Sequence, residues 1–111
     1  MKEDVSFDEW DKLDLRVGTI DEVDDIAGAD KLYKLTVDLG EEKRILAAGL
    51  KNHYSKDALK GEQCIVFNNL KPRMLKGIES RGMVLACSDL DKGKVVLLQP
   101  SKKMPNGSRV S

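Results

Sequence analysis

Apolar and polar residues alternate along much of the chain, and this period of two is typical of half-buried β-strands. The clearest example runs over residues 33–39, whose apolar positions are Tyr33, Leu35, Val37 and Leu39. Residues 40–42 (Gly-Glu-Glu) indicate a turn, and residues 44–48 follow as a second strand-like stretch. The pattern therefore predicts a β-hairpin over residues 33–48.

The first predicted strand changes its phase part-way along. Leu13, Leu15 and Val17 alternate with polar residues. After Gly18 the apolar residues resume at Ile20, on the other parity. A glycine at such a change predicts a β-bulge or a sharp bend. One bent strand can serve two sheets, which is how small barrels close.

Two short helices and three further strands complete the predicted elements. Ser6 and Glu9 form the capping-box pattern of a helix start. Phe7 and Trp10 share one face of that helix, which we expect to dock on an apolar surface. A second helix is predicted over residues 55–59. The further strands are expected at residues 64–67, 83–87 and 94–98.

The order of these elements indicates an all-β fold. Five or more short strands, with a helix between the third and the fourth, favour a five-stranded Greek-key barrel of the oligonucleotide/oligosaccharide-binding type, the OB fold. Another small β-barrel stays open as the alternative, because periodicity does not separate the two. We expect a single domain, with an N-terminal helix in residues 1–12, the barrel in residues 13–88 and a C-terminal extension in residues 89–111.

Composition indicates one soluble domain in a reducing compartment. The chain has 111 residues, of which 34% are charged and 41% apolar, as is typical of one soluble globular domain. No apolar run reaches the roughly 20 residues of a membrane span, and the acidic N-terminus lacks the apolar core of a signal peptide. Cys64 and Cys87 each lie in an apolar run, which predicts buried, reduced thiols without a disulfide, in a reducing, cytoplasmic compartment.

The residue types that most catalysis needs are missing. His53 is the single histidine, and no cysteine or second histidine stands at metal-ligand spacing from it. The chain has no GxSxG, Walker A or GxGxxG motif. We therefore expect no enzymatic activity, no cofactor and no metal site.

The net charge of zero hides an uneven distribution. Residues 1–30 hold eleven acidic and three basic side chains, so the rest of the chain carries an excess of eight positive charges. The densest basic stretch is residues 68–83, which reads as a loop because of its proline and glycines. Its cations are Lys71, Arg73, Lys76 and Arg81. Four cations on a short loop make a patch suited to phosphate.

Four segments resemble the free-standing tRNA-binding domain family, the module also found at the C-terminus of many methionyl-tRNA synthetases. They are residues 14–18 (Asp-Leu-Arg-Val-Gly), 29–35 (Ala-Asp-Lys-Leu-Tyr-Lys-Leu), 69–73 (Asn-Leu-Lys-Pro-Arg) and 77–83 (Gly-Ile-Glu-Ser-Arg-Gly-Met). They follow the order and spacing of the family, and the resemblance extends from Phe7 to the end. It implies an OB-fold barrel that binds tRNA by its shape, without catalysis.

The resemblance and the residue chemistry together define a predicted binding set. The resemblance implies tRNA contact at Lys31, Asn69, Ser80 and Met83. Charge adds the cations of the barrel face and the basic loop, which are Lys34, Lys71, Arg73, Lys76 and Arg81. Structural roles without RNA contact stay open for five of these residues. Asn69 and Ser80 could cap turns, Met83 could belong to the core, and Lys31 and Lys34 could lie on a solvated strand face.

These observations predict a non-catalytic tRNA-binding protein, acting as a tRNA chaperone or as a trans-acting subunit or cofactor of methionyl-tRNA synthetase. Family resemblance implies a homodimer, for which the Phe7/Trp10 helix and the 95–98 run are the predicted interface. A secretion-related peptide-binding chaperone of the same fold is the alternative. A docking module for synthetase complexes is a third reading. Residues 29–33 and 80–83 favour tRNA, because the chaperone relatives usually differ there.

Overall fold

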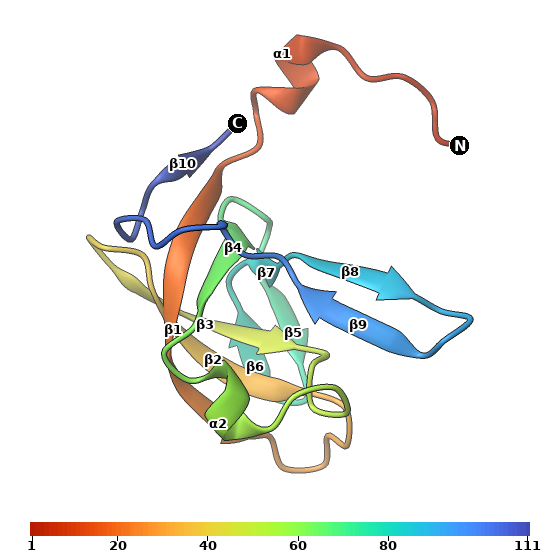
Figure 1. The fold of residues 1–111 in the computed structure, drawn as a ribbon, viewed down its shortest axis with the longest axis vertical. Coiled ribbons are helices and arrows are strands. Elements are labelled where there is room, and N and C mark those ends of the chain that lie inside the picture. The colour runs from red at the N-terminus through yellow and green to blue at the C-terminus, as the bar shows by residue number, and fades with distance from the viewer.

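A nearly closed barrel forms the body of the molecule in the computed structural model, which describes residues 1–111 (Figure 1). Its strands are β1 (Leu15–Asp25), β2 (Tyr33–Asp38), β3 (Lys43–Ala48), β4 (Gln63–Phe67) and β7 (Met83–Val84). They pair antiparallel in the order β3-β2-β1-β4-β7. Helix α2 (Lys56–Leu59) connects β3 to β4. This all-β barrel confirms the predicted fold class.

The remaining elements decorate this barrel. They are α1 (Phe7–Trp10), β5 (Arg73–Leu75), β6 (Ile78–Ser80), β8 (Ala86–Asp89), β9 (Lys94–Leu97) and β10 (Arg109–Val110). The strands β5 and β6 form one hairpin and β8 and β9 another, while β10 pairs with β1. The predicted strand at residues 83–87 is thus divided between β7 and β8. No helix is long and apolar enough to cross a membrane.

The predicted hairpin of residues 33–48 is confirmed as β2 and β3. Its turn closes through a hydrogen bond from the Leu39 N–H to the Glu42 carbonyl, with N and O 2.8 Å apart. Gly40 has a φ of 93°, which glycine adopts without steric cost. The apolar residues of β2 alternate inward and their polar neighbours outward, as the period of two requires.

The phase change in β1 has a different cause from the one predicted. Leu15 and Val17 pack with Ile65 in an outer cluster that Leu98 and Val110 cover. Residues further along β1 point instead to the barrel interior. The strand therefore buries both faces in turn, because the C-terminal extension covers one of them.

Gly18 is not the site of the irregularity. It pairs regularly with Cys64 on β4. The register with β2 shifts instead between Ile20 and Glu22, which leaves the bulge at Asp21. A side chain at Gly18 has no room, because an added Cβ would lie 2.5 Å from Cγ1 of Val37. The glycine thus permits close packing between β1 and β2, and its prediction as the site of the bulge was wrong.

The two cysteines have opposite environments. Cys64 is fully buried in the barrel core, and this burial raises the pKa of its thiol to about 12. Cys87 is exposed on β8, so the prediction of two buried thiols was wrong for this residue. The hairpin of β8 and β9 extends away from the barrel, and an apolar run there does not imply burial (Figure 1). Both cysteines are free.

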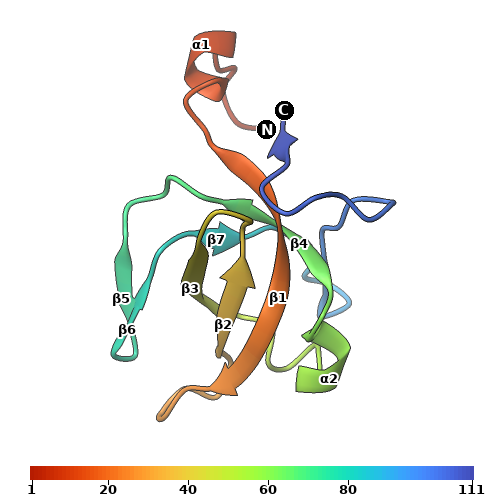
Figure 2. The same cartoon turned by 90° about the vertical axis from the view of Figure 1, so that its left-hand side faces the viewer.

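Helix α1 stands beyond the end of the barrel, near the C-terminus (Figure 2). Its predicted capping box is confirmed, since the Ser6 hydroxyl accepts from the Glu9 N–H and the Glu9 carboxylate accepts from the Ser6 N–H. Phe7 and Trp10 remain 72% and 38% exposed, so their face docks on no apolar surface within this chain. An ion pair between Arg109 and Asp11, 3.0 Å apart, ties the segment after α1 to β10.

The C-terminal extension lies along β1. The Val17 N–H donates to the Ser108 carbonyl at 2.9 Å, and the Gly107 N–H donates to the Val17 carbonyl at 2.7 Å. The Thr19 hydroxyl donates to Oδ1 of Asn106 at 2.7 Å. Residues 106–110 thereby act as a further partner of the first strand.

We expect Gly18→Val to destabilise the fold by about 1–3 kcal/mol, the usual cost of overpacking a core. The new side chain would collide with Val37 on β2. Urea unfolding measures the change. Gly49→Ala is the control, because a Cβ at Gly49 meets no atom within 4 Å. Equal unfolding midpoints for Gly18→Val and the wild type would contradict the packing argument.

Candidate nucleic-acid interface

The basic segment is a defined hairpin and not the loop that its composition suggested. Strands β5 and β6 pair from Arg73–Ser80 to Leu75–Ile78. The two turn residues, Lys76 and Gly77, have φ values of 51° and 82°, and a two-residue turn with both φ positive is of type I′. Figure 2 shows this hairpin standing beside the barrel. The Lys-Gly pair between two apolar residues, in Leu-Lys-Gly-Ile, was the available signal for the hairpin.

A cleft of about 200 Å³ lies between this hairpin and the barrel. Its lining comes from the loop before β2, from β3 and the residue after it, from the 68–72 loop, and from the segment of β5 to β7. The residues are Leu32, Ala47, Gly49, Leu70, Arg73, Leu75, Ser80, Gly82 and Met83. Three predicted site residues, Arg73, Ser80 and Met83, therefore meet at one cleft.

A second hollow of about 370 Å³ adjoins the first and shares Leu32 with it. It is lined by residues 28–32 and by Lys76 at the hairpin turn. Lys31 and Lys76, which are 45 positions apart in the sequence, thus face one hollow. The two hollows bring five of the predicted residues onto one side of the molecule.

The other predicted cations lie around this side less directly. Lys34 on β2 stands across from Ala47, which lines the cleft, and its other cross-strand neighbour is Asp24. Lys71 is exposed in the loop between β4 and β5. Arg81 is the one member with an acidic partner, since its Nε lies 3.9 Å from a carboxylate oxygen of Glu79.

Acidic residues of β1 neutralise lysines elsewhere. Asp21 pairs with Lys43 at 2.9 Å, and Asp25 with Lys56 at 2.8 Å and with Lys51 at 3.1 Å. Hydrogen bonds from Lys56 and then Lys51 hold the pKa of Asp25 below its usual value. The cations without a carboxylate partner include Lys31, Lys34, Lys71, Arg73 and Lys76. Positive charge is therefore left uncompensated around the cleft.

Asn69 and Ser80 have structural contacts in place of free hydrogen-bonding groups. Asn69 accepts from the Asp14 N–H at 2.8 Å and donates to the Lys12 carbonyl at 2.7 Å. The Ser80 hydroxyl is buried, where it accepts from the Ala47 N–H at 3.0 Å and donates to the Gly82 carbonyl at 3.2 Å. In this geometry both side chains position the loops beside the cleft, which is the structural role left open for them, and their contact with tRNA stays a prediction.

Comparison with known proteins agrees with this geometry. Residues 15–109 match the family model described as "Putative tRNA binding domain". The chain belongs to the tRNA-binding domain family. It is homologous to the domain at the C-terminus of methionyl-tRNA synthetases.

Specific relatives of this tRNA-binding domain come from two kinds of protein. A methionine–tRNA ligase of Thermococcus kodakarensis is 50% identical over 106 residues, which are 96% of this chain and 14% of the ligase. The chain thus spans about one-seventh of that relative. Among solved structures, a MetRS-related protein of Pyrococcus horikoshii has a TM-score of 0.92 and 34% identity, covering 99% of this chain and 100% of that one. The chaperone CsaA of Bacillus anthracis has a TM-score of 0.87 and 30% identity, covering 98% and 100%.

Arg44 holds the basic hairpin of the tRNA-binding domain at both ends. One guanidinium nitrogen, Nη1, donates to the Asn68 carbonyl at 2.6 Å and to the Arg81 carbonyl at 3.4 Å. Nε of Arg44 lies 3.0 Å from a Glu42 oxygen, which orients the group. The two residues that flank the segment 69–80 are therefore hydrogen-bonded to the same guanidinium group. Sequence reasoning missed Arg44, because it lies outside the basic stretch and its carbonyl partners lie far along the chain.

Asp14, the first residue of the family segment 14–18, has a structural role at the start of β1. Its carboxylate accepts from Nε of Arg16 at 2.9 Å and from Nδ2 of Asn68 at 3.1 Å. Its backbone carbonyl accepts from the Asn68 N–H at 2.7 Å. The hydrogen bond from Arg16 and then that from Asn68 hold the pKa of Asp14 below 3.8. The start of β1 is thereby fixed to the loop that leads to the basic hairpin.

The side chains that ligate metals are scattered in this structure. No group of three His, Cys, Asp or Glu residues lies close enough to hold a metal ion. His53 is exposed and does not line the cleft. The arrangement offers cations, an apolar surface and rigid loops, which are the means of binding a polyanion.

We expect Asp14→Asn to remove a pH-dependent part of the stability. Because the folded-state pKa of Asp14 is lowered, its contribution is present above pH 3.8 and is lost as pH falls through the folded-state pKa. The variant should therefore be less stable than the wild type near neutral pH, with a difference that shrinks in acid. Urea unfolding along a pH series measures this, and a constant difference at all pH values would contradict it.

Proposed function

We propose that this chain binds folded tRNA without chemical transformation, through the phosphate backbone around the cleft. The observation that carries the proposal is that three cations without carboxylate partners, Lys31, Arg73 and Lys76, gather at that cleft and its adjoining hollow. A preformed basic surface suits recognition of RNA by shape, because double-stranded RNA displays its backbone more readily than its base edges. The five aromatic residues are too few for a platform that stacks successive bases.

The cellular role that we propose is that of a tRNA chaperone or a trans-acting methionyl-tRNA synthetase cofactor in the cytoplasm. The support is homology to a domain that synthetases carry within much longer chains. In trans, such a domain would raise the local concentration of tRNA for a synthetase. Peptide binding is the second candidate, because the chaperone CsaA has nearly the same fold.

We also propose a homodimer that uses the exposed apolar residues of α1. Neither Phe7 nor Trp10 is buried within its own chain. Residues 95–98 were also predicted to lie in the dimer interface. Of these, Val96 is 45% exposed and available to a second copy, whereas Leu97 is buried in the main core. A second copy would present a second basic cleft, and two linked sites bind one large RNA more tightly than a single site does.

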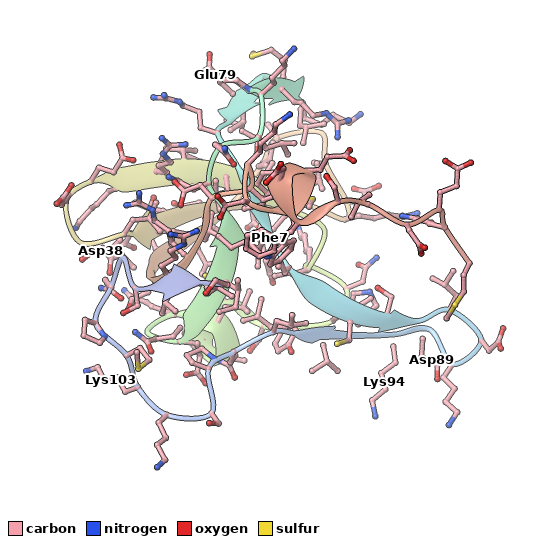
Figure 3. All side chains as sticks on the ribbon, turned by 90° about the horizontal axis from the view of Figure 1, so that it is seen from above. Phe7, Asp38, Glu79, Asp89, Lys94 and Lys103 are labelled. Carbon is pink, nitrogen blue, oxygen red and sulfur yellow. The ribbon has the colours of Figure 1, made fainter.

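Lys71→Ala and Arg73→Ala should each weaken tRNA binding and lower its salt dependence. Each substitution removes about one phosphate contact, so the slope of log affinity against log salt should fall by roughly one. Filter binding of folded bulk tRNA at several salt concentrations measures both quantities. Lys94→Ala is the matched control, because Lys94 lies on the hairpin of β8 and β9, apart from Glu79 on the basic hairpin (Figure 3).

Competition distinguishes the two candidate functions. Folded tRNA should displace the labelled tRNA, whereas an unfolded peptide should not. If the peptide alone binds, or if both variants bind tRNA like the wild type at every salt concentration, then the basic hairpin is not the RNA interface.

The dimer proposal predicts two copies in solution at micromolar concentration. Light scattering should give twice the monomer mass of 12.4 kDa. Replacing both exposed aromatic residues, by Phe7→Ser and Trp10→Ser, should shift the population to the monomer while each chain stays folded, since neither side chain is buried within its own chain. A monomeric wild-type protein would contradict the proposal.

A further inference from the structure

Phosphate binding does not account for the interior of the cleft. Its lining includes the apolar side chains of Leu32, Leu70, Leu75 and Met83. A polyanionic backbone gains nothing from contact with such groups, because burying a charge away from water costs free energy. Met83 is 43% exposed here, so it does not serve as a fully buried core residue. The cleft therefore suits a flat, uncharged group that accompanies phosphate.

A nucleobase that has left the helical stack is such a group. Its two faces are apolar, and its edge carries hydrogen-bonding atoms. The polarizable thioether of Met83 and the leucines can contact the faces. The guanidinium of Arg73, which lines the same cleft, is available to the phosphate of the same nucleotide. Lys31 and Lys76 at the adjoining hollow stand where the backbone on either side of that base would pass.

We propose that the cleft receives one unstacked nucleobase of the bound RNA, with Met83 as its contacting residue. The proposal rests on the proposed tRNA binding and adds a site for an individual base to it. Shape then selects the RNA, and the cleft selects a place where the RNA exposes a base.

The cleft is built before any ligand arrives. The Ser80 hydroxyl fastens the hairpin to β3 through the Ala47 N–H, and Arg44 fixes the residues that flank the hairpin. The type I′ turn adds a fixed end. Binding to a preformed site loses little conformational entropy, so a single base contributes measurably to affinity.

Gly49 provides a way to fill the cleft without disturbing the barrel. It lies in the lining, and a Cβ there would meet no atom within 4 Å. Gly49 also lacks the positive φ that makes substitution of other glycines costly. Gly49→Val would therefore add volume to the open space, while Met83→Ala would remove a contact.

Met74 supplies the matched control for Met83. It lies on the same basic hairpin and is 65% exposed, but it is absent from the lining of the cleft. Removal of a base contact commonly costs at least fivefold in affinity. We expect Gly49→Val and Met83→Ala to weaken folded-tRNA binding about fivefold or more with an unchanged salt slope, and Met74→Ala to change neither quantity.

Methyl NMR of the full chain tests occupancy directly. With ¹³C-labelled methionine methyl groups, titration with folded bulk tRNA should move the Met83 resonance upfield through the ring current of the base, and should leave Met74 nearly unmoved. The Gly49→Val variant should lose this shift. This readout does not require a variant that binds, so it decides the question even if a substitution disturbs folding.

The outcomes separate this proposal from the one on which it rests. If tRNA binds with the expected salt dependence but the Met83 methyl does not move and both cleft variants bind normally, then the cleft holds no base and backbone binding stands alone. If tRNA does not bind, both proposals are wrong. If an unfolded peptide, and not tRNA, moves the Met83 methyl, then the cleft receives an apolar side chain.

Discussion

The hydrogen bonds of the Arg44 guanidinium determine where the basic hairpin lies. This group is only 17% exposed, and it joins the carbonyls of Asn68 and Arg81, the two residues that flank the hairpin segment. A buried cation must have such partners, because an unpaired one is costly. A charge within the barrel wall thus converts twelve residues that would otherwise form a free loop into a fixed arm beside the cleft. The hydrogen bonds of Asn69 and Ser80 then fix the two ends of a segment whose position Arg44 already sets.

Electrostatic complementarity is arranged by pairing and not by net charge. The formal net charge of the chain is zero, which taken alone argues against a polyanionic ligand. Acidic residues of β1 form ion pairs with several lysines of other elements. The lysines and the arginine at the cleft have no carboxylate partner and can bind an anion. A protein can therefore remain neutral overall and still attract phosphate locally, at distances within the Debye length of roughly 8–10 Å.

Local periodicity predicted most of the barrel, and contacts between distant residues account for the errors. The β2–β3 hairpin followed from alternation alone, because its partners are adjacent in the sequence. The phase change at Gly18 was misread because the outer face of β1 is covered by Leu98 and Val110, which no local pattern connects to it. Cys87 was predicted to be buried because it lies in an apolar stretch, but that stretch belongs to a hairpin that extends away from the barrel. In the candidate site, composition located the cations, but the contacts of Asn69, Ser80 and Arg44 depend on carbonyls and amides that a sequence pattern does not place.

The contact between residues 106–110 and β1 has a consequence for biosynthesis. The outer cluster of Leu15, Val17 and Ile65 is completed only when Val110 and the 107–108 segment pair with the first strand. During translation, β1 emerges early but waits for almost the whole domain before its outer face is covered. Such long-range closure slows folding and leaves apolar strand surface exposed on the nascent chain. The outer face of β1 is therefore covered only after the chain has been synthesised through residue 110.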